Sequence, residues 1–365
     1  MSACLAAPAA AAPLDALLSA APERVAPTAY VELGIDRLNR ALDFSTSADE
    51  ASNAGSGAAP TVNTTNAPGR GNYRASQLLG SWQMIDGLWL TGALGERRVS
   101  NAVDTFRYRS WQVSAQARVL QASGTRPAVA LRLSAWGNHA SVTEATTPVH
   151  VPGAILDTVT VTRPSDRSLQ ADVIGTWVLS PALDLSAALG VGSTRLAYGS
   201  LAATTTRNGC PYQLSFNGND IFGNLTGPCA DTGGGVIRQF YDRSGDYGVD
   251  VAPEIAWRGR FVQAGVSASW RRGDWTLRGG YLLHVASRDG VDDILTRRGD
   301  PAHKVNHIVA AEAALRLHPN LSAFARAQIS SKLFFNDLPV SYNTSTSSSF
   351  GSRYSLLTLG LRAGF

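Results

Sequence analysis

The sequence predicts an all-β protein, a transmembrane antiparallel up-and-down β-barrel of twelve strands, with fourteen strands as the alternative. Three observations lead to this fold class. Apolar and polar residues alternate along most of the chain, the connections fall into a short and a long class, and no run of about 18 apolar residues forms a membrane helix. The mean hydropathy of −0.05 fits, because a barrel turns only every second side chain toward lipid.

The last stretch, YSLLTLGLRAGF, shows the alternation clearly, since one parity holds Leu357, Leu359, Leu361, Ala363 and Phe365. The same period of two predicts a strand wherever it recurs over about ten residues. The predicted segments are 29–43, 73–84, 88–99, 106–120, 128–138, 168–179, 184–198, 236–257, 261–270, 275–286, 304–317, 321–334 and 353–365.

Thirteen segments conflict with the even strand number of bacterial single-chain barrels. Joining 236–257 to 261–270 as one long strand gives twelve strands, with a β-bulge between Trp257 and Val262. Fourteen strands would require one further strand that shows no pattern.

The connections are sorted by length. Short turns fall at 85–87, 123–127, 180–182, 271–274 and 318–320, and long polar connections at 45–72, 139–166, 200–235, 288–303 and 336–351. Outer-membrane barrels have short periplasmic turns and long extracellular loops. Tryptophans near the predicted strand ends, Trp82, Trp89, Trp177, Trp270 and Trp275, are expected to form an interfacial belt.

From about residue 28 onward the chain resembles the Gram-negative outer-membrane β-barrels, in a porin-like form and without likeness to one subfamily. Its last strand resembles their C-terminal assembly signal. The resemblance implies a place in the bacterial outer membrane, with the lipid bilayer and the barrel-assembly machinery as partners. It also implies that this machinery recognises Leu357, Leu359, Leu361 and Phe365.

The first residues resemble the end of a secretory signal peptide. Residues 1–12 are rich in alanine and contain an A-x-A-like site, although no basic residue precedes Arg24. We expect a truncated signal-like segment at 1–12, a periplasmic segment at 13–28 and the barrel at 29–365. An alanine-rich tail is the alternative for the first segment.

Two of the three cysteines, Cys210 and Cys229, lie in one stretch rich in glycine, asparagine and proline, which shows no strand pattern. A disulfide bond that closes this extracellular loop is expected, in an oxidising compartment. Two free thiols are the alternative.

If the apolar parity faces lipid, the other parity faces the lumen. The predicted lumen charges are Arg118, Arg132, Asp172, Arg278, Glu312, Arg316, Arg326, Lys332 and Arg362. A hairpin centred on Pro319 puts Leu317 opposite Leu321, and therefore Glu312 opposite Arg326. The set is either a structural network that fills a narrow barrel or a basic constriction that prefers anions.

The function expected from these features is passage of small, anionic solutes through a monomeric, porin-like channel. The first alternative is a non-conducting surface barrel whose loops bind a partner. The second is a hydrolase at the outer rim, with candidates Asp292, Asp293, Asp300, His303, His307, His139 and His150. No cofactor or metal is expected. Nucleic acid is not an expected partner despite the net charge of +4, because the basic residues are scattered singly.

Overall fold

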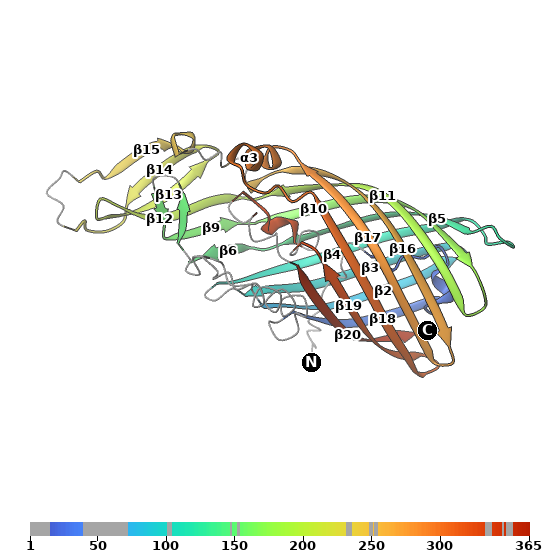
Figure 1. The fold of residues 1–365 in the computed structure, drawn as a ribbon. Helices are drawn as coiled ribbons and strands as arrows, with labels where there is room; N and C mark the ends of the chain where they lie inside the picture. Colours follow the sequence, from blue (N-terminus) through green and yellow to red (C-terminus); the bar gives the residue numbers. More distant parts are fainter. Residues whose placement is uncertain are drawn as a thin grey trace, which may run out of the picture.

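The computed structural model describes residues 15–38, 72–100, 104–146, 148–151, 154–230, 236–247, 251, 255–332, 338–344, 347 and 353–365. Twelve antiparallel strands form a closed barrel (Figure 1). In barrel order they are β1 (Ala29–Leu38), β2 (Asn72–Ile85), β3 (Leu88–Ser100), β4 (Thr105–Leu120), β5 (Ala128–His139), β10 (Ser165–Val178), β11 (Leu183–Ala197), β16 (Arg258–Arg272), β17 (Trp275–Arg288), β18 (Val305–His318), β19 (Leu321–Ser330) and β20 (Tyr354–Gly364). The last strand closes the barrel on the first, with Leu361 opposite Leu33. The fold class and the number of twelve strands are therefore confirmed.

The route by which the sequence led to twelve strands was wrong at one point. Residues 236–257 do not extend β16, which begins at Arg258 and pairs with β11 and β17 without a register shift. The short strand β15 (Gln239–Arg243) belongs instead to a second sheet outside the barrel. The predicted bulge between Trp257 and Val262 is absent, and the described strand within 236–257, β15, pairs in a different sheet.

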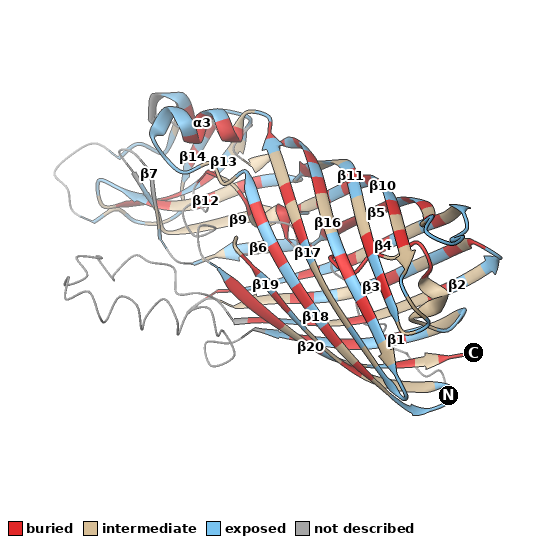
Figure 2. Ribbon diagram, turned by 45° about the vertical axis from the view of Figure 1, so that its right-hand side comes forward, coloured by how far each residue is buried: buried red, intermediate tan, exposed pale blue. Residues whose placement is uncertain are grey.

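The two parities of the barrel strands face opposite sides, as predicted (Figure 2). On β5, Leu133 is 66% exposed while its neighbour Arg132 is 8% exposed. Large apolar side chains are exposed all around the outer wall, among them Val31, Leu33, Leu94, Val113, Leu131, Leu169, Val173, Leu189, Val262, Val266, Val309, Leu359 and Leu361. A continuous exposed apolar wall of this extent requires lipid, so the protein is a membrane β-barrel.

The expected tryptophan belt is only partly present. Trp82, Trp270 and Trp275 are exposed on the outer wall beside the short turns. Trp89 is only 3% exposed and does not contribute to a belt. It precedes the outward-facing Leu90 by one residue, so the strand alternation turns it into the barrel.

The long connections between β5 and β10 and between β11 and β16 build a six-stranded sheet, hereafter the outer sheet (Figure 1). Its strands are β6 (Val142–Ala145), β9 (Thr158–Thr162), β12 (Ser200–Arg207), β13 (Cys210–Asn217), β14 (Asp220–Leu225) and β15. Beside it β7 (Val149–Val151) and β8 (Ala154–Leu156) form a hairpin. The expectation that the cysteine-bearing stretch contains no strands was wrong.

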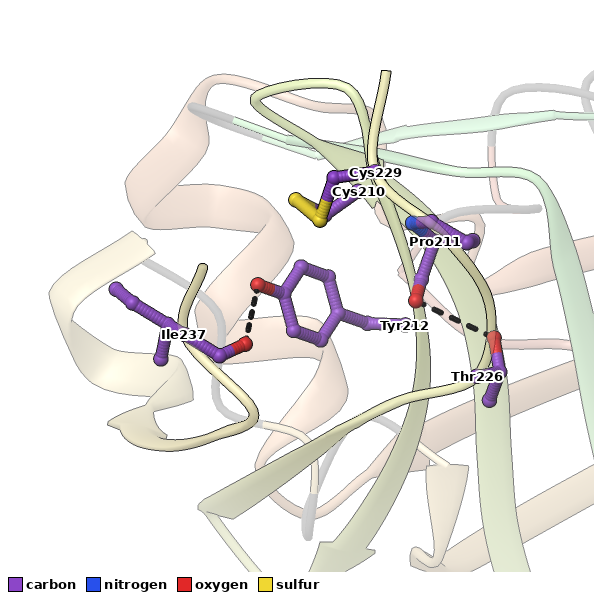
Figure 3. Close-up of a disulfide and its surroundings, with 6 residues drawn as sticks. All are labelled: Cys210, Pro211, Tyr212, Thr226, Cys229 and Ile237. Atoms are coloured by element: carbon purple, nitrogen blue, oxygen red, sulfur yellow. Dashed lines mark hydrogen bonds between the residues drawn. A yellow bond between two sulfur atoms is a disulfide. The ribbon is translucent and has the colours of Figure 1, made fainter. Parts of the chain in front are cut away.

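The disulfide bond between Cys210 and Cys229 is present, as predicted, with the two Cα atoms 4.1 Å apart (Figure 3). It ties the start of β13 to the chain that follows β14. Beside it, the Tyr212 hydroxyl donates a hydrogen bond of 2.8 Å to the carbonyl oxygen of Ile237. These links hold the far edge of the outer sheet together.

The described residues also contain the short helix α3 (Val291–Arg298) and the 3₁₀ turns η1 (Pro22–Arg24), η2 (Ser244–Tyr247) and η3 (Pro339–Ser341). At the end of the barrel nearest the outer sheet, buried apolar side chains of β2, β4, β11 and β20 meet α3 and the η3 region. We call this group the mouth cluster: Tyr73, Tyr108, Leu196, Trp257, Val291, Leu295, Leu338, Tyr342, Tyr354 and Leu356. Within the described parts of the chain, no helix has the length and apolar character needed to cross a membrane.

Candidate functional site

A network of buried ion pairs extends over the four neighbouring strands β17, β18, β19 and β20. The predicted pairing is confirmed, since Glu312 lies opposite Arg326 and accepts a hydrogen bond of 2.5 Å from its Nη2. Glu312 also lies 3.6 Å from Arg278 and 3.6 Å from Arg362. The turn of this hairpin differs from the prediction, because a register shift between Arg316 and His318 puts His318 opposite Leu321.

A second carboxylate, Glu32 of β1, joins the same network and was absent from the predicted set. It accepts a hydrogen bond of 2.7 Å from Arg362 and lies 3.9 Å from Arg326. The signal that could have found it is local: Val31 and Leu33 flank it on the outward parity. The network therefore contains three arginines and two glutamates, which carry one surplus positive charge.

A separate buried pair lies on β5 and β10. Arg132 donates to Asp172 at 2.9 Å, and the side-chain amides of Gln170 and Gln263 donate to the same carboxylate at 2.7 and 2.9 Å. All four residues are buried. This carboxylate is thus satisfied by three donors that lie inside the barrel, as its parity predicts.

The other three predicted lumen charges lie near or beyond the ends of their strands. Arg316 binds Asp274 at 2.8 Å beside a short turn, where both side chains are more than half exposed. Lys332 follows the end of β19, and its backbone nitrogen donates to Asn306. Arg118 lies at the turn end of the lumen, where it pairs with Glu23 and with Asp86.

Residues 15–27, which we call the inner segment, lie against the inner wall at the end of the barrel that carries the short turns. Side chains of four strands bind the backbone of this segment. Gln116 donates to the Ser19 carbonyl at 2.9 Å, and Ser267 donates to the Leu18 carbonyl at 2.9 Å. Arg278 donates to the Leu17 carbonyl, and Thr176 Oγ1 accepts a hydrogen bond of 2.8 Å from the Ala20 nitrogen. Residues 1–12, the signal-like segment of the prediction, are outside the described residues.

Two leucines anchor the inner segment. Leu17 packs against Leu282, Ile308 and Ala310, and Leu18 packs against Ala128, Ala130 and Ile174. On β17, Gly280 allows the close approach, because a Cβ atom there would collide with the carbonyl oxygen of Ala16. Arg24 completes the attachment through Asp184 at 2.9 Å. The segment expected to be periplasmic is therefore, in its described part, a lining of the barrel interior.

A polar cavity of about 160 Å³ remains between the inner segment and the ion network. Glu32, Arg132, Arg278, Arg326 and Arg362 line it on the wall side, and residues 15–19 line it on the other. Among the described residues, the barrel therefore contains the inner segment and this polar cavity, and the mouth cluster lies at the end nearest the outer sheet.

Three of the hydrolase candidates at the rim, Asp292, His303 and His307, have defined surroundings. Asp292 is 2% exposed and is held by the Arg288 guanidinium at 3.0 Å, while His307 bonds the Tyr281 hydroxyl at 2.8 Å. Burial lowers the pKa of His303, and the nearby positive charges of Lys332 and Arg288 lower it further. Among the described residues no group of three metal-binding side chains occurs.

Solved structures with a related architecture are barrels. The KdgM porin in complex with disordered oligogalacturonate is 7% identical, with a TM-score of 0.38 over 92% of this chain and 99% of that chain. The translocator domain of the autotransporter NalP from Neisseria meningitidis is 10% identical, with a TM-score of 0.44 over 92% and 87%. The Ralstonia pickettii toluene transporter TbuX is 11% identical, with a TM-score of 0.38 over 98% and 96%. No protein-family model and no curated protein sequence matches this chain.

Proposed function

We propose that this protein is a bacterial outer-membrane channel for small solutes, and that the inner segment closes it in the conformation described. The observation that carries the proposal is the polar seat of that segment. Gln116, Thr176, Ser267 and Arg278 hold its backbone, and all four side chains can bind water equally well once the segment leaves. A seat of this kind can become a hydrated lumen wall, whereas exposure of a purely apolar seat to water would be unfavourable.

The size of the barrel supports the same function. About eight strands leave an interior that side chains fill, and sixteen leave an open aqueous channel. With twelve strands, the element that occupies the lumen decides whether a path exists. The large apolar side chains of the inner segment that pack on the wall are Leu17 and Leu18, with Ala16 and Ala20 beside them.

For selectivity we propose a modest preference for anions. The cavity beside the inner segment is lined by Arg132, Arg278, Arg326 and Arg362 and by the carboxylate of Glu32. Rings of arginine favour anions in pores. Because Glu312, Glu32 and Asp172 offset most of that charge, the preference should be weaker than a ring of unpaired arginines would produce.

The channel is tested by locking the inner segment to the wall. Ser19 Oγ and Thr176 Oγ1 are 3.5 Å apart, so these neighbouring positions are chosen for a disulfide lock in the variant Ser19→Cys/Thr176→Cys. The third native cysteine is removed by Cys4→Ser, and that single variant is the control. In planar bilayers we expect no conductance steps from the oxidised double variant, and steps with a positive anion selectivity from the control and after reduction. Steps of equal size from the oxidised lock would contradict closure by the inner segment.

We also propose that the barrel-assembly machinery recognises the last strand, β20, and inserts the barrel into the membrane. Phe365 is 78% exposed and Leu359 and Leu361 face outward on β20, which supports recognition of this strand by the barrel-assembly machinery. We further propose that the barrel functions as a monomer.

A surface barrel that binds a partner through its loops is the second candidate. The outer sheet favours it, because a disulfide-linked sheet is a firmer platform than a simple loop. Complete absence of conductance steps in the control and in the reduced lock would favour this candidate over the channel.

A further inference from the structure

A cavity of about 480 Å³ lies between the outer sheet and the mouth of the barrel. Figure 1 shows the outer sheet projecting from the barrel end opposite the C-terminus, and the strands that continue from β5, β10 and β11 lead into it. The cavity is separate from the polar cavity beside the inner segment, because the two share no lining residue.

One wall of the cavity is the apolar face of the outer sheet. The strand register places Val161, Leu201, Phe216 and Ile221 side by side across β9, β12, β13 and β14. All four line the cavity. Residues of the opposite parity, such as Ala202 and its partner Ser215, face away from it. The sheet is therefore amphipathic, with its apolar side toward the barrel.

The other wall comes from the barrel mouth. Phe106 and Tyr108 of β4, Tyr198 after β11, and Val340 and Tyr342 of the η3 region line this side. Tyr108 and Tyr342 also belong to the mouth cluster, so the cavity borders that cluster.

The cavity offers no uncompensated charge to an ion. Its charged lining residues among those described are Arg207 and Asp242, which pair with each other at 2.9 Å. The Arg207 guanidinium also lies over the Phe240 ring, 5.0 Å from its centre. Burial raises the pKa of Tyr198 and of Tyr342, so both hydroxyls stay neutral at physiological pH.

We infer that this cavity binds a neutral, predominantly apolar small molecule, and that aromatic rings suit it best. Its volume lies in the range of roughly 300–1,000 Å³ typical of small-molecule sites, and such sites are apolar with a few polar groups. The aromatic side chains of the two walls can stack on a ring of the ligand. The inference does not depend on conduction. If the channel proposal holds, this cavity is where such a solute first contacts the barrel.

Binding is tested by calorimetric titration of 2-naphthol into the full chain, held in amphipol so that no micelle absorbs the probe. We expect one saturable site. Ala145→Trp puts an indole into the cavity from β6, and Ala197→Trp does so from the barrel side. Each should weaken binding by more than about tenfold. Ala202→Trp lies on the opposite face of the outer sheet and should bind as the parent chain does.

Two arms separate the possible results. 2-Naphthalenesulfonate has the same rings with a negative charge and should show no saturable binding, so equal binding of both probes would overturn the assignment to neutral ligands. Absence of a saturable site for 2-naphthol in the parent chain, or unchanged affinity in both tryptophan variants, would overturn the site itself.

The oxidised Ser19→Cys/Thr176→Cys lock should bind 2-naphthol normally, because the inner segment lies at the other end of the barrel. Failure of the channel and failure of this site are therefore distinguishable.

Discussion

At the scale of single residues, the interior of this barrel is a set of paired charges rather than a row of free arginines. Glu312 and Glu32 neutralise most of the charge of Arg278, Arg326 and Arg362. Glu312 is only 3% exposed, so its carboxylate has little access to water and depends on these partners. Loss of one partner from such a buried pair lowers the stability strongly, because the other charge is left buried and uncompensated.

The substitution Glu312→Gln should therefore destabilise the barrel by about 3–5 kcal/mol, because it leaves buried guanidinium groups without their partner. The midpoint of the thermal transition from the fast-migrating folded form to the unfolded form on electrophoresis measures this effect. Glu96→Gln is the matched control, since Glu96 pairs with Arg98 at 3.2 Å and is half exposed. It should change stability by less than about 1 kcal/mol. Equal shifts in both variants would show that Glu312 is not coupled to the arginines.

Individual lumen charges were predictable from parity alone where a strand was recognised. Arg132, Asp172 and Arg278 lie where the alternation of their strands places them. Parity alone did not reveal that Arg316 pairs with Asp274 beside the short turn, because it does not specify where along the strand a side chain becomes exposed. Glu32 follows the same alternation between Val31 and Leu33, so it was open to the same reasoning.

At the scale of elements, strands of ten or more residues were recognised and shorter ones were not. The strands β13 and β14 contain eight and six residues and lie in a stretch rich in glycine and asparagine, which weakens the alternation signal. Their pairing depends on contacts with β9 and β12 that no local pattern specifies. The disulfide bond was predictable because both cysteines lie in that one stretch.

Removal of the disulfide bond by Cys210→Ser/Cys229→Ser should loosen the outer sheet but not the barrel. A bond across 19 residues restricts the unfolded chain by about 3 kcal/mol. We expect faster proteolytic cleavage between residues 200 and 243 and an unchanged thermal transition of the barrel. Cys4→Ser is the control and should alter neither measurement. A matching loss of barrel stability would mean that the outer sheet and the barrel unfold as one unit.

The inner segment is the second element that the sequence did not reveal, because its contacts join residues 15–27 to strands far along the chain. The double variant Leu17→Ala/Leu18→Ala should remove roughly 2 kcal/mol of packing at each site. We expect longer or more frequent conductance steps in planar bilayers than with the parent chain. Leu185→Ala, an exposed site on the outer wall, is the control and should leave the steps unchanged. Unaltered steps in the double variant would mean that the leucines do not hold the segment closed.

At the scale of the whole molecule, the protein inverts the arrangement of a soluble domain. Large apolar side chains cover the outer wall, while glutamines, serines and ion pairs fill the interior. This inversion was predictable because a period of two is a local property that each strand carries separately. The contacts of the inner segment inside the barrel were not predictable, because they depend on which residues meet across a closed barrel.

The division of the connections into short turns at one end and long connections at the other predicts the orientation of the barrel in the membrane. If the long connections face the cell exterior, a cysteine on α3 should be accessible from outside and one in the β4–β5 turn should not. In the Cys4→Ser background, Asp293→Cys is an exposed site on α3 and Thr125→Cys is an exposed site in that short turn. A membrane-impermeant maleimide applied to intact cells should label the first variant fully and the second only after the outer membrane is permeabilised. Labelling in the reverse order would place the outer sheet and its apolar cavity on the periplasmic side, where a solute arriving from outside would meet the inner segment first.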